Sequence, residues 1–168
     1  GTCSVNASGV INFTSAGQGC SITVTKDSEA NYLARSSAAT VILVAKANQA
    51  SFTWDLSSPS VPYGQTLSLA TAGGSGTGAV VYSVVSTPPT CSINATTLSL
   101  SNVGSICEIS ATKVSDANYN SADTVTQSIT VTKISQANLT FSNGNTLVYG
   151  QIMDLLAIGG SGGGSITY

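Results

Sequence analysis

The side chains that could perform covalent chemistry are few, and the four cysteines are the most regularly spaced of them. Cys3 and Cys20 lie 17 positions apart, and Cys91 and Cys107 lie 16 apart. Structural zinc sites need closely spaced Cys-x₂₋₄-Cys pairs, and the chain has no histidine to help complete one. We therefore predict two disulfides, Cys3–Cys20 and Cys91–Cys107, with buried free thiols as the alternative. Disulfides indicate an oxidising compartment, so we expect an extracellular or cell-surface protein.

The carboxylates do not form the pattern that acid–base catalysis would need. Without histidine there is no catalytic triad and no imidazole proton shuttle. None of the seven Asp and Glu residues is paired in a way that recurs along the chain. Spacing alone does not exclude a glycosidase pair, but nothing in the sequence supports one. We expect a protein that is not an enzyme and needs no cofactor.

One turn offers oxygen ligands to a cation. It contains Asp116 and Asn118, and the matching position earlier in the chain contains Asp27 and Glu29. Calcium takes six to eight oxygens, often from several carboxylates, whereas each turn supplies one or two carboxylates and an Asn. A turn in which Asn bonds to its own backbone, followed by an anchoring Tyr, explains the motif without metal. We expect no metal site, and these four residues are weak calcium candidates.

Four asparagines begin Asn-x-Ser/Thr sequences, the acceptor pattern for N-glycosylation. In a chain so rich in Ser and Thr, chance would supply several of them. They are candidate glycosylation sites where the source organism glycosylates secreted proteins, and otherwise surface asparagines: Asn6, Asn12, Asn94 and Asn138.

The composition argues against nucleic acid and membrane partners. Only 7% of residues are charged, against roughly 25% in an average domain. The five cations are spread along the chain instead of clustered, so phosphate binding by counterion release is not expected. No apolar run approaches the roughly 20 residues that span a bilayer, and no signal peptide opens the chain, as expected for a mature or internal segment. A neutral Ser/Thr surface suits either packing against copies of the same chain or an ordinary hydroxyl-rich secreted protein.

The elements that must position these residues are strands. Apolar and polar residues alternate around Phe52 and Trp54, Val80 to Val84, Cys107 to Ala111, and Val125 to Val131. Period-2 alternation is typical of strands with one buried face. About seven such strands, separated by Gly-, Pro- and Asn-rich turns, predict an all-β, two-sheet sandwich.

The chain also repeats itself at intervals of 86 to 88 positions. Self-similarity at a fixed period predicts an array of like modules, and this period suits one immunoglobulin-sized sandwich. We predict a C-terminal part of a module at 1–47, a complete module at 48–134 and an N-terminal part at 135–168. The recurring sequences are Thr2-Cys3-Ser4 with Thr90-Cys91-Ser92, Ala30-Asn31-Tyr32 with Ala117-Asn118-Tyr119, Gln49-Ala50 with Gln136-Ala137, Tyr63-Gly64-Gln65 with Tyr149-Gly150-Gln151, and Gly73-Gly74-Ser75-Gly76 with Gly159-Gly160-Ser161-Gly162.

These motifs resemble a bacterial immunoglobulin-like repeat. The resemblance rests on Tyr-Gly-Gln at 63–65, Leu-Ser-Leu-Ala-Thr at 67–71, the Gly-rich stretch that ends at Tyr82, and Ala-Thr-Lys-x-x-Asp-Ala-Asn-Tyr at 111–119. It covers 49–133 and both partial units. Repeats of this kind occur in tandem in large secreted or cell-surface proteins, where they act as stalks, adhesin shafts and fibre modules. The resemblance therefore implies a non-catalytic structural role.

The two partial units together make one module that lacks only the counterparts of 83–88. We therefore expect copies of the chain to join head to tail, with the tail of one completing the head of the next. A continuous covalent array is the rival hypothesis for the join. The alternative function is the shaft of a cell-surface adhesin that contacts a host or a glycan.

Overall fold

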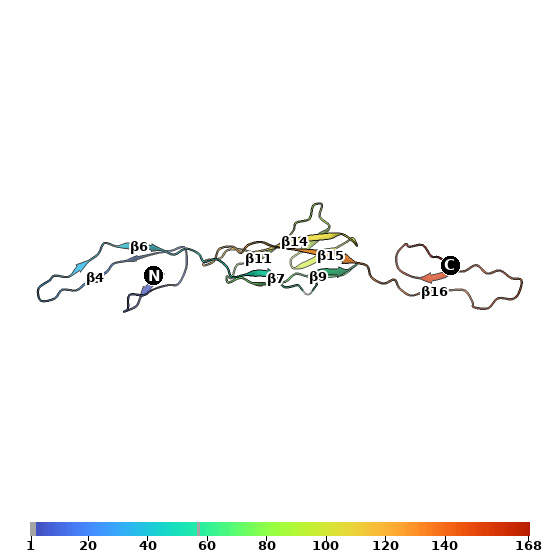
Figure 1. Cartoon of the computed structure of the whole chain (residues 1–168), viewed down its shortest axis with the longest axis horizontal. Helices are drawn as coiled ribbons and strands as arrows, with labels where there is room; N and C mark the ends of the chain where they lie inside the picture. Colours follow the sequence, from blue (N-terminus) through green and yellow to red (C-terminus); the bar gives the residue numbers. More distant parts are fainter. Residues whose placement is uncertain (1–2, 57) are drawn as a thin grey trace.

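The computed structural model describes residues 3–56 and 58–168, and its regular elements are all strands. The all-β prediction is therefore confirmed. Figure 1 shows an elongated chain with three parts along its long axis. We call them the N-terminal segment (3–47), the central segment (48–134, without residue 57) and the C-terminal segment (135–168).

The central segment contains two sheets that share one core. Neighbouring strands run antiparallel, except that β8 runs parallel to β15. The first sheet has the order β11 (Val80–Val84), β14 (Ile106–Lys113), β15 (Val125–Thr132) and β8 (Ser60–Pro62), and the second has the order β12 (Cys91–Asn94), β13 (Thr97–Leu100) and β9 (Thr66–Ser68). A separate pair is formed by β7 (Phe52–Trp54) and β10 (Thr71–Gly73).

Residues that alternate in the sequence form the core between these sheets. Leu98 on β13, Ile109 on β14 and Ile129 on β15 are fully buried, and Val61 on β8 packs with them. The Cys91–Cys107 disulfide joins β12 to β14, and hence one sheet to the other, with a Cα–Cα distance of 5.9 Å. Both the disulfide and the buried face of β14 confirm what the sequence predicts.

The two outer segments are built from isolated strand pairs. In the N-terminal segment β1 (Cys3–Val5) pairs with β2 (Ile11–Phe13), β3 (Gly19–Ile22) with β6 (Thr40–Leu43), and β4 (Thr25–Lys26) with β5 (Arg35–Ser36). The predicted Cys3–Cys20 disulfide links β1 to β3 and is confirmed. In the C-terminal segment β16 (Leu139–Phe141) pairs with β17 (Ala157–Gly159). Among the described residues of these two segments, Cys20 is the one buried side chain.

The central segment has more strands than the sequence predicts. Period-2 alternation does not reveal β8 or β10, because Ser60–Pro62 contains one large apolar residue and Thr71–Gly73 contains none, so neither can alternate. β8 also contains Pro62 and follows Pro59, whose carbonyl accepts the N–H of Thr130. Proline has no N–H to donate, which restricts such a strand to a sheet edge and hides it from propensity arguments.

Candidate assembly interface

The N-terminal segment has an open apolar groove. About 520 Å³ lies between the β1–β2 hairpin and the β3–β6 pair, lined by Val5, Ile11, Ile22, Val24 and Ile42 among others. None of its lining residues is charged. Val24 is 70% exposed and Ile42 is 37% exposed. An apolar face of this kind favours a partner segment that is itself apolar and uncharged.

The same positions are buried in the central segment. Counting 87 residues on, Ile22 matches Ile109 and Ile42 matches Ile129, both of which are fully buried. In the central segment these side chains are covered by residues from the first half of that segment, including Val61, Leu69 and the partly buried Trp54, Leu67 and Tyr82. The groove is therefore the open counterpart of a closed core.

The C-terminal segment has the matching excess of exposed apolar side chains. Leu147 is 53% exposed, whereas Val61, 86 positions earlier, is 3% exposed. Leu155 is 50% exposed, whereas its counterpart Leu69 is 4% exposed. Leu139, Phe141 and Tyr168 are exposed as well, and their counterparts Phe52, Trp54 and Tyr82 are buried or half-buried in the central segment. Asp154 is the one charged residue in the whole C-terminal segment.

The β16–β17 pair of the C-terminal segment repeats the hydrogen bonds that flank the β7–β10 pair. Gly160 N–H donates to Asn138 O at 3.1 Å, as Gly74 N–H donates to Ser51 O at 2.9 Å. The side-chain oxygen of Gln136 accepts the Ser161 N–H, and that of Gln49 accepts the Ser75 N–H. The β16–β17 pair therefore has the local hydrogen bonding of β7–β10, whereas 146–154 and 166–168, which correspond to β8, β9 and β11, form no strand among the described residues.

The Asp116 carboxylate serves as a turn cap. One oxygen accepts the N–H groups of Asn118 and Tyr119 at 2.9 and 2.8 Å, and the other accepts the N–H and hydroxyl of Thr77. These backbone hydrogen bonds, first that of Thr77 and then those of Asn118 and Tyr119, lower the pKa of Asp116 to about 2. Since both oxygens are engaged in this way, the turn is held without a cation.

Of the remaining calcium candidates, Asn118 lies in this turn and the other two lie in the N-terminal segment. Asp27 and Glu29 are exposed near the β4–β5 hairpin, and the side-chain oxygen of Asn118 accepts the N–H of Ala16 at 2.9 Å. Within the described residues, no three His, Cys, Asp or Glu side chains gather closely enough to hold a metal ion.

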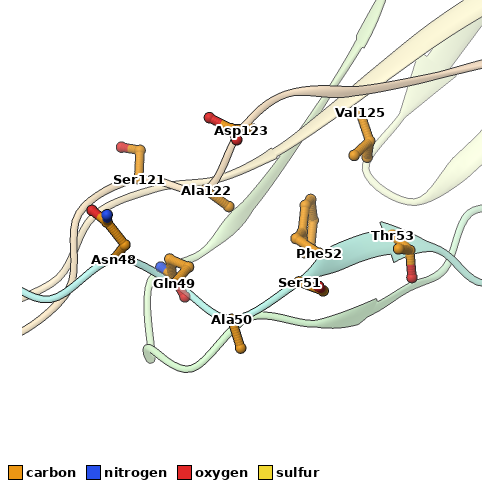
Figure 2. Close-up of a pocket in the computed structure, with 10 residues that line it drawn as sticks. All are labelled: Asn48, Gln49, Ala50, Ser51, Phe52, Thr53, Ser121, Ala122, Asp123 and Val125. Carbon is orange, nitrogen blue, oxygen red and sulfur yellow. The ribbon is translucent and has the colours of Figure 1, made fainter.

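A second groove, of about 560 Å³, follows the edge of the central segment between residues 48–53 and 121–125. Figure 2 shows the Phe52 ring pointing from β7 toward the 121–125 side, whereas Ala50 and Thr53 point away. Asp123 is the one charged residue in its lining. The groove therefore contains no acid–base pair.

The four glycosylation candidates are all exposed, namely Asn6, Asn12, Asn94 and Asn138. The Asn6 side chain also closes the turn of the β1–β2 hairpin, since its oxygen accepts the N–H groups of Ser8 and Val10. Surface exposure is compatible with modification at each position.

The repeat in the sequence predicts that the partial units pair, but it does not predict which residues line the groove. The pattern that would have identified them is the 87-position match of Ile22, Val24 and Ile42 to core residues.

No helix in the described part of the chain is long and apolar enough to cross a membrane. Searches against family models, curated proteins and solved structures find no match to this chain.

Proposed function

We propose that this chain is a non-catalytic structural module of an extracellular filament, built from tandem immunoglobulin-like β-sandwich modules joined head to tail. In the filament, the C-terminal segment of one copy fills the groove in the N-terminal segment of the next. The observation that supports this most strongly is the matched exposure described above: apolar residues open in both outer segments correspond to residues closed in the central core.

The central segment supplies the expected register for the joint. There Leu67 pairs with Leu98, Val61 with Val131, and Tyr82 with Ala111. The corresponding pairs between copies are Met153 with Ile11, Leu147 with Val44, and Tyr168 with Val24, the first residue in each pair coming from the donating copy. The joint thus adds strands to sheets on both sides of the groove.

Strand addition of this kind combines two contributions. Main-chain hydrogen bonds along the added strands provide affinity, and alternate side chains that enter the groove provide specificity. Each large apolar side chain that becomes buried contributes about 1.5–3 kcal/mol. The scarcity of charge on both faces means that little charge must be desolvated when they meet.

The joint is heterologous, because the surface that donates differs from the surface that accepts. Such contacts propagate into an open filament unless the rotation between copies closes a ring. Two disulfides, one in each of the N-terminal and central segments, suit a filament outside the cell, where reduction is rare.

Purified chain tests the proposal directly. Analytical ultracentrifugation and negative-stain microscopy should reveal concentration-dependent filaments. In denaturing, reducing electrophoresis these should give one band near the chain mass of 16.8 kDa. A chain that sediments as a monomer at every concentration would overturn assembly by complementation. In filaments taken from the natural source, a far larger denatured band would show that peptide bonds form the joint instead.

A further inference from the structure

The central segment holds the N-terminal segment at two separate points. The first is the linker residue Ala47, which forms a parallel bridge with Tyr119. Ala47 N–H donates to Asn118 O at 2.9 Å, and Asn120 N–H donates to Ala47 O at 2.8 Å. The Asn120 side chain also donates to that of Asn48 at 3.0 Å. The linker is therefore bonded to the 116–120 turn along its length.

The second point is a side-chain contact. The Asn118 side-chain oxygen accepts the N–H of Ala16, 102 positions earlier, at 2.9 Å. Ala16 belongs to a loop that is itself tied to the end of the N-terminal segment, since Gly17 N–H donates to Val44 O at 2.7 Å. Two attachments on different elements restrict rotation between the segments, whereas the linker alone would leave a hinge.

The turn that presents Asn118 is rigid for local reasons. The Asp116 carboxylate accepts the backbone N–H groups of Asn118 and Tyr119 on one side and Thr77 on the other. This fixes the Asn118 backbone relative to the body of the central segment. A short side chain on a fixed backbone can position its acceptor accurately.

The two halves of a second junction of this type lie at the outer tip of the N-terminal segment and at the end of the central segment that leads into the C-terminal segment. At the outer tip of the N-terminal segment (Figure 1), Glu29 and Tyr32 exchange backbone hydrogen bonds of 2.9 and 3.2 Å, with Asn31, the counterpart of Asn118, between them. At the other end of the central segment, Gly104 N–H donates to Val131 O at 3.2 Å, as Gly17 N–H does to Val44 O. This places Val103 and Ile134 as the counterparts of Ala16 and Ala47.

We propose that Asn118 and Asn31 are alignment residues that set the angle between consecutive modules. Asn118 acts within the chain through Ala16. Asn31 acts between copies, where it accepts the N–H of Val103 from the copy that donates its C-terminal segment, while Ile134 of that copy bridges to Tyr32. The partner at the outer tip is thus a second copy of this chain. The role of Asn31 rests on the proposed function, whereas that of Asn118 does not.

The role of Asn118 within the chain is tested by single-molecule energy transfer on the full chain. Dyes are attached through unnatural amino acids at Ser4 and Ser128, both exposed and neither in the lining of the groove, and the labelled chain is diluted into unlabelled chain. Asn118→Ala should widen the distance distribution at least twofold. Asn118→Asp, which keeps an acceptor for the Ala16 N–H, should retain the narrow distribution. An unchanged width in Asn118→Ala, with its central segment folded by circular dichroism, would overturn the proposal.

The role of Asn31 between copies is tested on filaments by electron microscopy. Asn31→Ala should still polymerise but shorten the persistence length at least twofold, whereas Asn94→Ala, an exposed position of the central segment outside both proposed contacts, should not. Equal stiffness in Asn31→Ala and wild type would overturn the role of Asn31. Failure of the wild-type chain to polymerise would count against the proposed function and the Asn31 contact together, and the energy-transfer result would still decide the role of Asn118.

Discussion

Leu139 and Phe52 each lie opposite a glycine in a two-stranded ladder, yet one side chain is open and the other is covered. Leu139 faces Gly159 and is 56% exposed, whereas Phe52 faces Gly73 and is 8% exposed. Phe52 is covered by Ala111 and Ala122 from the second half of the central segment. The β7–β10 pair and the β16–β17 pair therefore have the same strand register, but other strands cover only the β7–β10 pair.

Substitution of Leu139 should separate assembly from folding. Leu139→Asp places an unpaired carboxylate on the face that would be buried in the joint, which costs several kcal/mol. We expect the association constant to fall by at least about 100-fold, or about 2.7 kcal/mol. The measurement is sedimentation velocity over a concentration series.

The matched control is Thr140→Asp on the same strand. Its counterpart Thr53 is exposed in the central segment, so Thr140 should remain exposed in the joint. Thr140→Asp is expected to assemble as wild type does. Equal loss of assembly in both variants would show that added charge, and not the buried face, is responsible.

The structure separates what local sequence can predict from what it cannot. Alternation at Ile109 and Ile129 predicts strands and their buried faces because side-chain direction alternates along every strand. Even the disulfides follow from spacing within each unit. The bond from Ala16 to Asn118 does not, because it joins residues 102 positions apart and depends on how two segments meet. The groove is not predictable from local sequence either. Val24 and Ile42 have the sequence surroundings of ordinary strand residues, and they are unusual only because no other strand covers them.

Joining the two outer segments should produce a closed module. The test chain runs from 135 to 168, continues through a loop copied from 83–88, and ends with 1–47. We expect cooperative, two-state unfolding, because the apolar residues of both segments would then share one core. Thermal unfolding followed by circular dichroism provides the measurement. The reverse order, 1–47 followed by the same loop and 135–168, is the control, and non-cooperative melting of both chains would contradict the prediction.

The Cys91–Cys107 disulfide should stabilise the fold of the central segment, whereas the Cys3–Cys20 disulfide should stabilise the joint between copies. Cys91→Ala with Cys107→Ala should lower the unfolding free energy of the central segment by about 3 kcal/mol, because the bond closes a loop of 16 positions. Cys3→Ala with Cys20→Ala should leave that transition unchanged and weaken assembly, since this bond holds two walls of the groove. Urea denaturation and sedimentation distinguish the two effects. A loss of central stability in the second variant would contradict the separation.

Acid should weaken the 116–120 turn over a defined pH range. The pKa of Asp116 is lowered from 3.8 to about 2 in the folded chain. Its stabilising effect is therefore complete above the unfolded value and is lost as the pH falls toward about 2. The stability difference between wild type and Asp116→Asn should be largest above about pH 5 and be lost as the pH falls through about 2, as measured by urea denaturation at each pH. A difference that stays constant over this range would contradict the assignment.

Gly73, the last residue of β10, lies against the Ser51 carbonyl, which directly precedes β7. Gly73 has a φ of +84°, and a Cβ there would lie 1.9 Å from the Ser51 carbonyl oxygen. Gly64 has a similar φ of +80° with nothing within 4 Å of the added atom. Gly64→Ala should thus cost only the left-handed backbone penalty of about 1–2 kcal/mol.

Gly73→Ala adds a collision with backbone, and relief requires β10 to move away from β7. That movement would break the β7–β10 ladder, in which Phe52 lies opposite Gly73. We expect a loss of about 3 kcal/mol or more in the central segment, visible in thermal unfolding as a clearly lower midpoint than that of Gly64→Ala. Equal midpoints would mean that β10 accommodates the methyl group without separating from β7. The equivalent Gly159→Ala, where the added atom would lie 2.0 Å from the Asn138 oxygen, should leave the central transition intact and weaken assembly.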